Sequence, residues 1–449
     1  MPSIDFKPKP YTGRPKEEIA KLRKEKLNPG IFKVYSDFFY ATQGYMQYIY
    51  DEKGQQHLDL FGGICTVSVG HCHPVFNEKL KEQIDKLQHI STLYLTEQAS
   101  LLAEKIGKKL PPDLDNVYFV NSGSEANELA LLMAQLYTGN NDIIALQHAY
   151  HGAGTTSNNL TSLRTWRYNV PSQIQVKHAV SPYNYRSPLG KCTIEESTRH
   201  AIDNLRRQID FGGSGDIALY YSEPAYQGVG GIMPTAGDGT YHKQAYQIIR
   251  DAGGLCLADE VQSGWGRLGN RYWGFEKQGV TPDFVTGAKS MGNGIPLAMV
   301  VTRKEIADKL AGKLHFNTFG GNPISCAAGL AVMDIIESDN LQENCKKTGD
   351  RFLQGLKKLQ DKHQIVGDVR GEGLQIGVEL VADRESLKPL SAATMGKLMD
   401  ETLKHRILIG KGGLYGNILR IQPPMCITEG DVDYTLAVLD QVFQNVRIE

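Results

Sequence analysis

Lys289 ends an apolar, β-branched stretch of the sequence and is followed closely by Gly292. A second apolar stretch, residues 254–258, ends in the acidic pair Asp259 and Glu260. One buried strand that ends in a lysine, and another that ends in a carboxylate, favour amine chemistry, because a desolvated lysine readily loses its proton and forms a Schiff base. The alternative is a surface lysine after a strand. The residues at the other strand ends favour the chemical interpretation.

Short apolar strands alternate with helical segments from about residue 75 onward. This pattern predicts a mainly parallel sheet with helices on both faces. The helices are expected at 75–87, 97–108 and 125–137, and the strands at 117–120, 143–146, 217–221, 255–258 and 284–286.

A chain of 449 residues is expected to form more than one domain. The two ends of the chain lack the regular alternation of strands and helices found in its middle part. Residues 16–26 predict a helix, and residues 47–60 predict a β-hairpin. After Pro323 we expect helices at 325–336 and 341–362 and strands at 374–380 and 419–421. The predicted domains are an N-terminal segment with the hairpin (1–65), a large domain (66–324) and a small α+β domain (325–449), with the hairpin packed on the small domain.

Composition and charge argue against several classes of protein. The 49 basic and 50 acidic residues give a net charge of −1, so no nucleic-acid partner is expected. No apolar window approaches about 18 residues, so no transmembrane helix is expected. The seven cysteines are scattered, which favours free thiols. His71 and His73 lie in a turn before Pro74, where we expect no metal site.

The residues that follow the strands decide which ligand the sheet would bind, because ligands of open α/β sheets lie at the carboxyl ends of the strands. Asn121, Ser122, Gly123 and Ser124 precede a long helix. Free backbone N–H groups, the helix dipole and two hydroxyls at such a helix start suit a phosphate. The alternative is that Ser124 is only the N-cap, with Asn127 at the third helical position.

Three further strand ends suit a cationic aromatic ring attached to that phosphate. Tyr150 could stack on a planar ring, although a packing role is the alternative. Asp259 would keep a ring nitrogen protonated, since an opposite charge raises its pKa. Lys289 would form the Schiff base and then move the proton between carbons. Gln262 could hydrogen-bond the ring hydroxyl. The residues together predict pyridoxal 5'-phosphate as cofactor.

These motifs resemble those of the class III (ω-type) pyridoxal-phosphate aminotransferases, over nearly the whole chain. The motifs are Asn-Ser-Gly-Ser-Glu-Ala-Asn at 121–127, Ala-Tyr-His-Gly at 149–152, Glu-Pro at 223–224, Ala-Asp-Glu-Val-Gln at 258–262, Ala-Lys at 288–289 and Thr-Phe-Gly-Gly-Asn-Pro at 318–323. The resemblance implies fold type I, with a mainly parallel seven-stranded sheet in the large domain. Segments 315–321, 366–371 and 425–428 are similar to the branch that uses alanine and glyoxylate.

The resemblance also implies roles for three more residues and a partner. Thr318 is expected to reach the phosphate bound to the other subunit, so a homodimer with shared active sites is expected. Both a dimer and a tetramer of paired dimers are compatible with the sequence. Arg420 is expected to clamp the substrate carboxylate. Glu223 is expected to pair with Arg420 and to release it when a carboxylate arrives. The alternatives are a turn cap for Thr318 and a structural salt bridge for Arg420.

The expected activity is transfer of an amino group from alanine or a β-/ω-amino acid to glyoxylate or pyruvate, by a ping-pong Schiff-base mechanism. A phospholyase of the same class, another ω-amino acid transaminase and a non-enzymatic relative are the alternatives.

Trp265 stands where phenylalanine is more usual, so it alters either packing or the pocket. The family implies a mitochondrial location, while Glu17, Glu18 and Glu25 are unusual for a transit peptide, which leaves a cytoplasmic location as the alternative.

Overall fold

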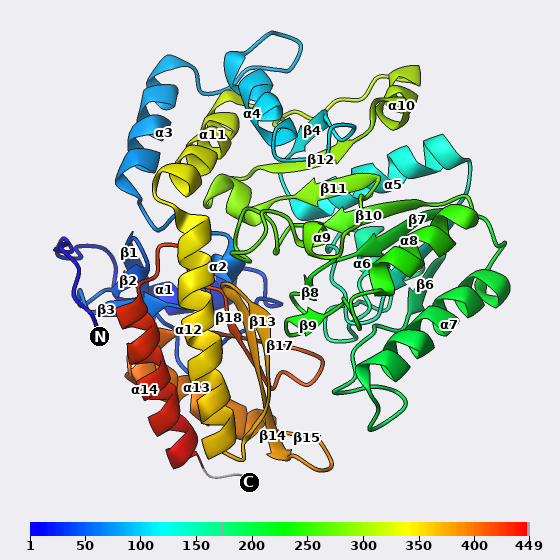
Figure 1. Ribbon diagram of the computed structural model, residues 1–449. Coiled ribbons are helices and arrows are strands. Elements are labelled where there is room, and N and C mark those ends of the chain that lie inside the picture. The colour runs from blue at the N-terminus through cyan, green and yellow to red at the C-terminus, as the bar shows by residue number, and fades with distance from the viewer. Residues whose placement is uncertain (173, 447–449) are drawn as a thin grey trace.

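A seven-stranded sheet forms the centre of the molecule (Figure 1). The computed structural model describes residues 1–172 and 174–446. All strands of this sheet are parallel except β12, which is antiparallel to both of its neighbours. In spatial order they are β4 (Asn116–Val120), β12 (Ala298–Thr302), β11 (Phe284–Gly287), β10 (Leu255–Asp259), β7 (Ile217–Ser222), β5 (Asp142–Leu146) and β6 (Val176–Ala179). The predicted mainly parallel, seven-stranded sheet is confirmed.

Helices cover both faces of the sheet, so β5, β7 and β10 are buried on both sides and read as continuous apolar runs. On β5 and β7, side chains alternate between two cores: Ile143 and Leu219 pack in one, and Ile144 and Tyr220 in the other. Helix α5 (Gly123–Thr138) contributes to the first core, and α7 (Ile194–Gly212) and α8 (Tyr241–Asp251) to the second. This sandwich fixes the strand ends at which the site is built.

The strands that the sequence analysis did not single out are β6 and β12. Strand β6 carries Lys177 and His178 in a run of four residues, which breaks its apolar pattern. Strand β12 begins two residues after Pro296, in an apolar run that was not named as a strand. The other five strands of this sheet and the six predicted helices lie within a few residues of their predicted ends, where assignment depends on tertiary contacts. The helices α7, α8, Ala392–Lys404 and Glu429–Asn445 were not predicted.

A second sheet lies in the C-terminal part of the chain and carries Arg420. Its order is β13 (Val366–Glu372), β14 (Gln375–Asp383), β18 (Ile418–Ile421) and β17 (Gly410–Gly412), with β15 (Lys388–Pro389) beside β14. Helices α12 (Leu341–Lys362), α13 (Ala392–Lys404) and α14 (Glu429–Asn445) accompany it. Figure 1 shows α12 and α14 side by side, away from the seven-stranded sheet.

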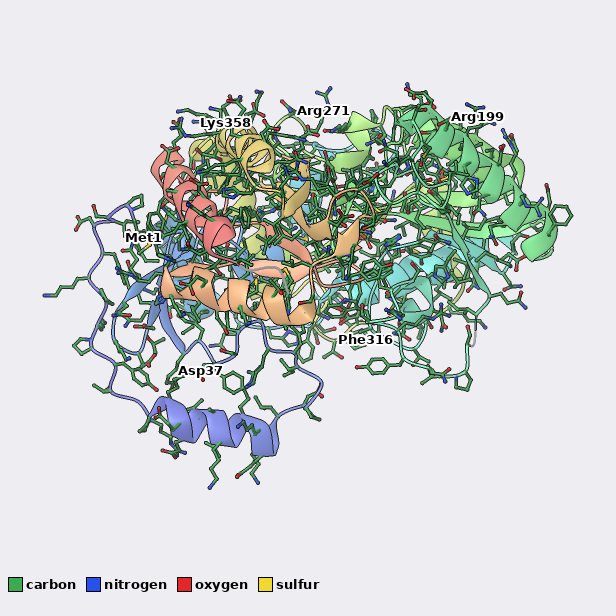
Figure 2. The ribbon with its side chains drawn as sticks, turned by 90° about the horizontal axis from the view of Figure 1, so that it is seen from below. Met1, Asp37, Arg199, Arg271, Phe316 and Lys358 are labelled. Atoms are coloured by element: carbon green, nitrogen blue, oxygen red, sulfur yellow. The ribbon has the colours of Figure 1, made fainter. Side chains whose placement is uncertain are left out.

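The N-terminal strands join this C-terminal part. Strands β1 (Ala41–Tyr45), β2 (Tyr48–Asp51) and β3 (Gln56–Asp59) form a sheet that is completed by β16 (Ile407–Leu408), parallel to β3. The buried carboxylate of Asp431 on α14 accepts hydrogen bonds from Gln47 and Tyr48. Helix α1 (Lys16–Lys26) buries no residue, and Figure 2 shows it apart from the main body.

The domain limits at 65/66 and 324/325 stay predictions. The second limit falls in the first turn of α11 (Pro323–Ser338), which packs on α3 (Pro74–Lys86) and α4 (Glu97–Gly107). Residues 447–449 of the expected small domain lie outside the described residues. The remaining short elements are α2 (Gly62–Cys65), α6 (Ser157–Leu160), β8 (Tyr226–Gln227), β9 (Met233–Pro234), α9 (Gly274–Lys277), η1 (Lys289–Gly292), α10 (Lys304–Ala307) and η2 (Asp308–Gly312).

Trp265 lies in the hydrophobic core and not at a pocket surface. Its ring is fully buried and packs edge-on against Trp273 and Tyr272, with centroid distances of 5.1 Å and 6.1 Å. Of the two expectations for this position, the structure supports an effect on packing.

Two helical glycines allow a matched test of how closely α12 packs. A Cβ on Gly349 would lie 2.3 Å from the carbonyl oxygen of Gly373, whereas a Cβ on Gly396 in α13 would meet nothing within 4 Å. We expect Gly349→Ala to destabilise the protein by about 1 to 3 kcal/mol through overpacking. Gly396→Ala should instead stabilise it by about 0.5 to 1 kcal/mol. Thermal unfolding followed by circular dichroism measures both, and equal shifts would contradict the packing described here.

Candidate active site

A cavity of about 340 Å³ opens at the carboxyl ends of the sheet strands. Eight of the ten predicted site residues line it: Ser122, Gly123, Ser124, Tyr150, Glu223, Asp259, Gln262 and Lys289. The other lining residues are Thr66, Asn121, Asn127, His151, Gly152, Val261, Ala288, Gly294, Ile295, Pro296 and Leu297. Thr318 and Arg420 are not among the lining residues.

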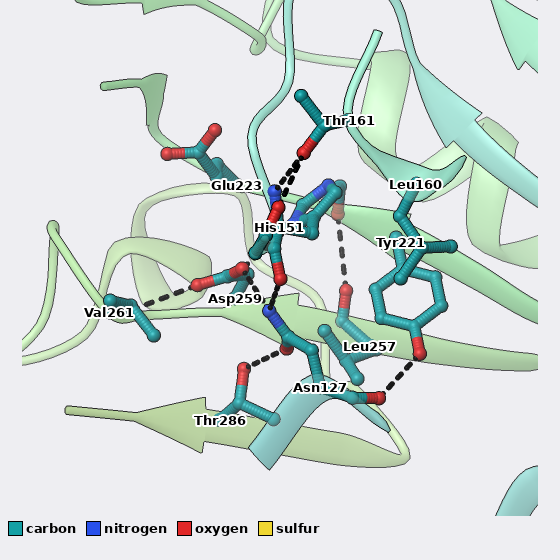
Figure 3. A network of polar contacts seen from close by, with 12 residues as sticks. Asn127, His151, Leu160, Thr161, Tyr221, Glu223, Leu257, Asp259, Val261 and Thr286 are labelled. Carbon is teal, nitrogen blue, oxygen red and sulfur yellow. Dashed lines mark hydrogen bonds and ion pairs between the residues drawn. The ribbon is translucent and has the colours of Figure 1, made fainter. Parts of the chain in front are cut away.

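Asp259 is the most firmly held polar group of the cavity. It ends β10, is 3% exposed, and its Oδ2 accepts hydrogen bonds from Nδ1 of His151 (2.7 Å) and Nδ2 of Asn127 (2.8 Å). Its Oδ1 accepts from the backbone N–H of Val261 at 3.1 Å. Figure 3 shows Asp259 between these partners. Three donors from three segments fix the carboxylate in one orientation, because rotation would leave a buried donor unsatisfied.

Asn127 connects this carboxylate to the sheet. Its Oδ1 accepts from the hydroxyl of Thr286 on β11 (2.9 Å), and its backbone oxygen accepts from the hydroxyl of Tyr221 on β7 (2.7 Å) (Figure 3). Asn127 and His151 lie within the sequence motifs, but neither was predicted to belong to the site. The available signal was helical spacing, since Asn127 lies four residues after Gly123 and therefore on the same face of α5.

His151 has one ring nitrogen free. Because Nδ1 contacts a carboxylate, the neutral imidazole carries its proton there, and Nε2 is then an acceptor. Nε2 is buried and has no hydrogen-bond partner in the described part of the chain. His151, in the 147–152 loop, positions Asp259 through the hydrogen bond of its Nδ1.

Lys289 follows β11, the strand that pairs with β10. In this pairing Thr286 lies beside Asp259, so the parallel register brings Lys289 to the same edge of the sheet. Its backbone has a positive φ of 48°, a conformation that costs free energy in a residue with a side chain. The amine makes no hydrogen bond or ion pair with the residues that the structure describes. It is therefore available to react.

The loop after Lys289 is pinned to the N-terminal part of the chain. The Ser290 hydroxyl donates to the backbone oxygen of Cys65 at 2.9 Å. The Asn293 side-chain oxygen accepts from the N–H groups of Ser68 and Val69 at 2.8 and 3.1 Å. These contacts hold the strained residue in place.

The start of α5 is suited to an anion. The N-cap is Ser122, whose hydroxyl accepts from the N–H of Glu125 at 3.2 Å, so the alternative that Ser124 caps this helix is wrong. The Ser124 hydroxyl instead accepts from the N–H of Ala153 at 3.3 Å. The first N–H groups of a helix of 16 residues have no intrahelical partner, and the helix dipole favours negative charge there.

Arg420 is held by two glutamines and not by a carboxylate. Its Nη2 donates to Oε1 of Gln262 at 2.8 Å and to Oε1 of Gln422 at 2.7 Å. The expected pair between Glu223 and Arg420 is not formed, and Arg420 has no ion pair with any described residue. The alternative of a structural salt bridge is therefore wrong as well.

Glu223 is fully buried and lines the cavity. Its Oε1 accepts from the N–H of Gly228 at 2.9 Å, while Oε2 has no partner in the described structure. Burial and the nearby charge of Asp259 raise the pKa of Glu223 to about 7. Glu223 therefore loses its proton less readily than an exposed glutamate.

Thr318 lies at the surface, outside the cavity. The preceding Asn317 accepts from the amide of Asn121 and donates to Glu125, each at 3.1 Å. The segment that carries Thr318 is thereby attached to the start of α5. A role of Thr318 at the site of another subunit stays a prediction.

The residues present fit pyridoxal phosphate. The cavity has an anion-binding helix start, a buried carboxylate fixed by three donors, an unpaired amine and the ring of Tyr150. Each matches a different part of that molecule: the phosphate, the ring nitrogen, the aldehyde and the aromatic face. Among the described residues, no group of three or more His, Cys, Asp or Glu could hold a metal ion, and no helix is long and apolar enough to cross a membrane.

Comparison with known proteins gives consistent matches over nearly the whole chain. The family model described as "Aminotransferase class-III" matches residues 33–443. The Arabidopsis thaliana protein named alanine–glyoxylate aminotransferase 2 homolog 2, mitochondrial, is 46% identical over 98% of this chain and 90% of its own length. The Homo sapiens alanine–glyoxylate aminotransferase 2, mitochondrial, is 39% identical over 98% of this chain and 88% of its own.

Two solved structures have the same fold. An amine transaminase from an uncultivated Pseudomonas species in its PLP-bound form has a TM-score of 0.86 at 29% identity, over 94% of this chain and 99% of its own. A phospholyase from Arthrobacter in complex with phosphoethanolamine has a TM-score of 0.87 at 27% identity, over 96% of this chain and all of its own.

The network around Asp259 can be tested without the cofactor. Asn127→Ala removes the donor to Asp259 and the acceptor of Thr286, so we expect a loss of about 2 to 4 kcal/mol of stability. Thr286→Val removes only the bond to Asn127 and should cost about 1 to 2 kcal/mol. The thermal unfolding midpoints of the cofactor-free proteins report the difference. A smaller effect of Asn127→Ala than of Thr286→Val would show that Asn127 does not connect the network.

Proposed function

The chain belongs to the class III aminotransferases, whose cofactor is pyridoxal phosphate, and from this premise we propose that it transfers an amino group from alanine or a β-/ω-amino acid to glyoxylate or pyruvate. The predicted family, enzyme class and cofactor are confirmed by these matches. The observation that carries the choice of substrate is Arg420. Its guanidinium is buried, has no counter-ion among the described residues, and donates a hydrogen bond to Gln262, which lines the cavity.

The proposed roles of the residues follow from their contacts. When bound, pyridoxal phosphate supplies an aldehyde that combines with amines and a ring that accepts electrons from the substrate carbon. Asp259, fixed by His151 and Asn127, would keep the ring nitrogen protonated. Lys289 would hold the cofactor through its Nζ and afterwards use the same nitrogen to move a proton between carbon atoms.

Tyr150, Ser122, Gly123, Ser124 and Gln262 would bind and orient the cofactor. Tyr150 offers an aromatic face, and the start of α5 offers N–H groups and hydroxyls for the phosphate. The Oε1 of Gln262 already accepts from Arg420, so the group of this side chain that is left for the cofactor is Nε2, a donor. A donor at this position suits a ring hydroxyl.

Arg420 would bind the substrate carboxylate, since a guanidinium and a carboxylate form paired hydrogen bonds of good geometry. Glu223 would then act through its charge on the cavity and not by direct pairing with Arg420. Oxo acids and amino acids both present a carboxylate, so one clamp serves both halves of the reaction.

Phospholyase activity is the second candidate, and another ω-amino acid transaminase activity is the third. The similarity to the Arthrobacter phospholyase supports the phospholyase, and a guanidinium also binds phosphate well. A phosphate ester would need its anion further from the amine than an α-carboxylate does. Activity on the two kinds of substrate therefore distinguishes these candidates.

We propose a homodimer with shared active sites as the working form, and pairing of dimers into a tetramer is left open. Large apolar side chains are exposed near the segment of Thr318: Leu93, Leu95, Leu314, Phe316 and Phe319. Figure 2 shows Phe316 at the surface of the chain. Such a group of side chains in a single subunit supports burial by a second one. Thr318 would then approach the phosphate site of the partner.

The mitochondrial names of both relatives support a mitochondrial location as part of this proposal. Detection of the full-length protein in isolated mitochondria, protected from added protease, would test it. A purely cytoplasmic signal would contradict it.

The substrate proposal predicts glycine formation from alanine and glyoxylate. Chromatographic detection of glycine should give a clear product with the wild-type enzyme, and phosphoethanolamine should release no phosphate. Arg420→Ala should raise KM for alanine by roughly 10- to 100-fold, with a much smaller effect on 1-phenylethylamine, which lacks a carboxylate. Phosphate release without glycine would favour the phospholyase instead.

The attachment proposal predicts that Lys289→Ala retains the cofactor only without a covalent bond. Borohydride treatment followed by peptide mass analysis should find the cofactor on the Lys289 peptide of the wild type and on no peptide of the variant. Amino transfer by the variant should fall at least about 1,000-fold, in the range lost on removing a key catalytic group. Lys309→Ala, at a lysine on η2 outside the cavity, is the control. A modified peptide that does not contain Lys289 would refute the assignment.

A further inference from the structure

The charge environment of Arg420 is unusual for a buried arginine. Arg370, also buried, forms ion pairs with Asp368 at 2.8 Å and with Glu379 at 2.9 Å. Arg420 is 3% exposed and has only neutral hydrogen-bond partners, Gln262 and Gln422. A buried charge without a counter-ion is costly, and this cost is recovered when an anion binds.

Gln422 makes side-chain hydrogen bonds both to Arg420 and to Gln262. It lies two residues after Arg420 and so on the same side of the extended chain. Its Oε1 accepts from Nη2 of Arg420 at 2.7 Å, and its Nε2 donates to Oε1 of Gln262 at 3.3 Å. Its backbone N–H donates to the oxygen of Leu60 at 2.8 Å, and its side chain is fully buried. Gln422 is therefore a fixed support for the guanidinium.

The donors of Arg420 determine how both amides are turned. An arginine can only donate, so each glutamine must direct its oxygen towards Nη2. Both hydrogen bonds are made by Nη2. Nε is buried without a partner, and Nη1 makes no hydrogen bond to any residue that the structure describes. Two nitrogens of the guanidinium, Nε and Nη1, thereby keep their N–H donors for a ligand.

The other groups around Arg420 do not neutralise it. The ring of Phe61 lies 5.3 Å from the guanidinium carbon, and a Cβ on Gly412 would lie 2.6 Å from the Arg420 Cδ. Cys65 donates to the same oxygen of Gln262 at 3.7 Å. Glu223 acts on Arg420 only through space. The aromatic face and the close glycine confine the side chain without adding a negative charge.

We propose that Gln422 is a positioning residue of the carboxylate site: with Gln262 it holds Arg420 by neutral amides, so that the substrate carboxylate becomes the counter-ion of the guanidinium. This inference rests on the proposed role of Arg420 and deepens it. A carboxylate at position 422 would compete with the substrate, and an apolar side chain would release the guanidinium. The amide does neither.

Two variants test the proposal in the holoenzyme. Gln422→Glu, nearly equal in shape, gives Arg420 an internal counter-ion, and Gln422→Met removes the acceptor. Calorimetric binding of propionate, an inert monocarboxylate, should weaken by roughly 10- to 100-fold in Gln422→Glu and by about tenfold in Gln422→Met. KM for alanine should rise by similar factors, while the rate constant of the half-reaction with 1-phenylethylamine, measured without any oxo acid, should change less than about threefold.

Gln375→Met is the matched control, because Gln375 is a fully buried glutamine of the neighbouring β14 that makes no hydrogen bond to Arg420. It should bind propionate as the wild type does. Thermal unfolding midpoints show whether each variant is folded, and Gln422→Glu decides the outcome should Gln422→Met not fold.

The results separate this inference from the proposed function. Loss of propionate binding in Arg420→Ala, together with unchanged binding in both Gln422 variants, would overturn the role of Gln422 alone. Unchanged propionate binding in Arg420→Ala would overturn the carboxylate clamp itself. Equal losses for alanine and 1-phenylethylamine in the Gln422 variants would reduce Gln422 to a structural residue and also overturn the inference.

Discussion

The parallel pairing of β10 with β11 is the constraint on which the site depends. It brings the carboxylate of Asp259 and the strand that leads to Lys289 to one edge of the sheet. The hydrogen bonds of Asn127 then join α5 to both strands, through Asp259 on β10 and Thr286 on β11. The helix start that suits a phosphate is therefore fixed relative to the acid and the amine. One buried amide sets the spacing of the three groups.

The distribution of charge in the cavity follows from how each group is paired. Asp259 has three hydrogen-bond donors, and Lys289 and Arg420 have no acidic partner among the described residues. Glu223 has one unpaired oxygen and a raised pKa because it is buried near Asp259. Unpaired charges in a buried place are costly unless a ligand compensates them. The cavity is thus prepared for a charged cofactor and a charged substrate.

The site also joins parts of the chain that are distant in sequence. Arg420 comes from β18 of the C-terminal sheet, whereas its partner Gln262 follows β10 of the central sheet. The left-handed turn of α2, where Gly62 and Gly63 have φ of 54° and 59°, precedes Cys65 and the segment that pins the Lys289 loop. Movement of the C-terminal part relative to the central sheet would therefore alter the carboxylate site directly.

The sequence alone determined five of the seven strands of the central sheet, six of the long helices and eight residues of the cavity. Apolar runs with polar residues at their ends mark strands that finish at a binding edge, and this pattern is local, so Lys289, Asp259 and Ser122 could be found without coordinates. Tertiary structure alone decided which side chains pair. The partners of Arg420 are Gln262 and Gln422, not Glu223. Asn127 and His151 hold Asp259, because these contacts depend on the packing of separate segments.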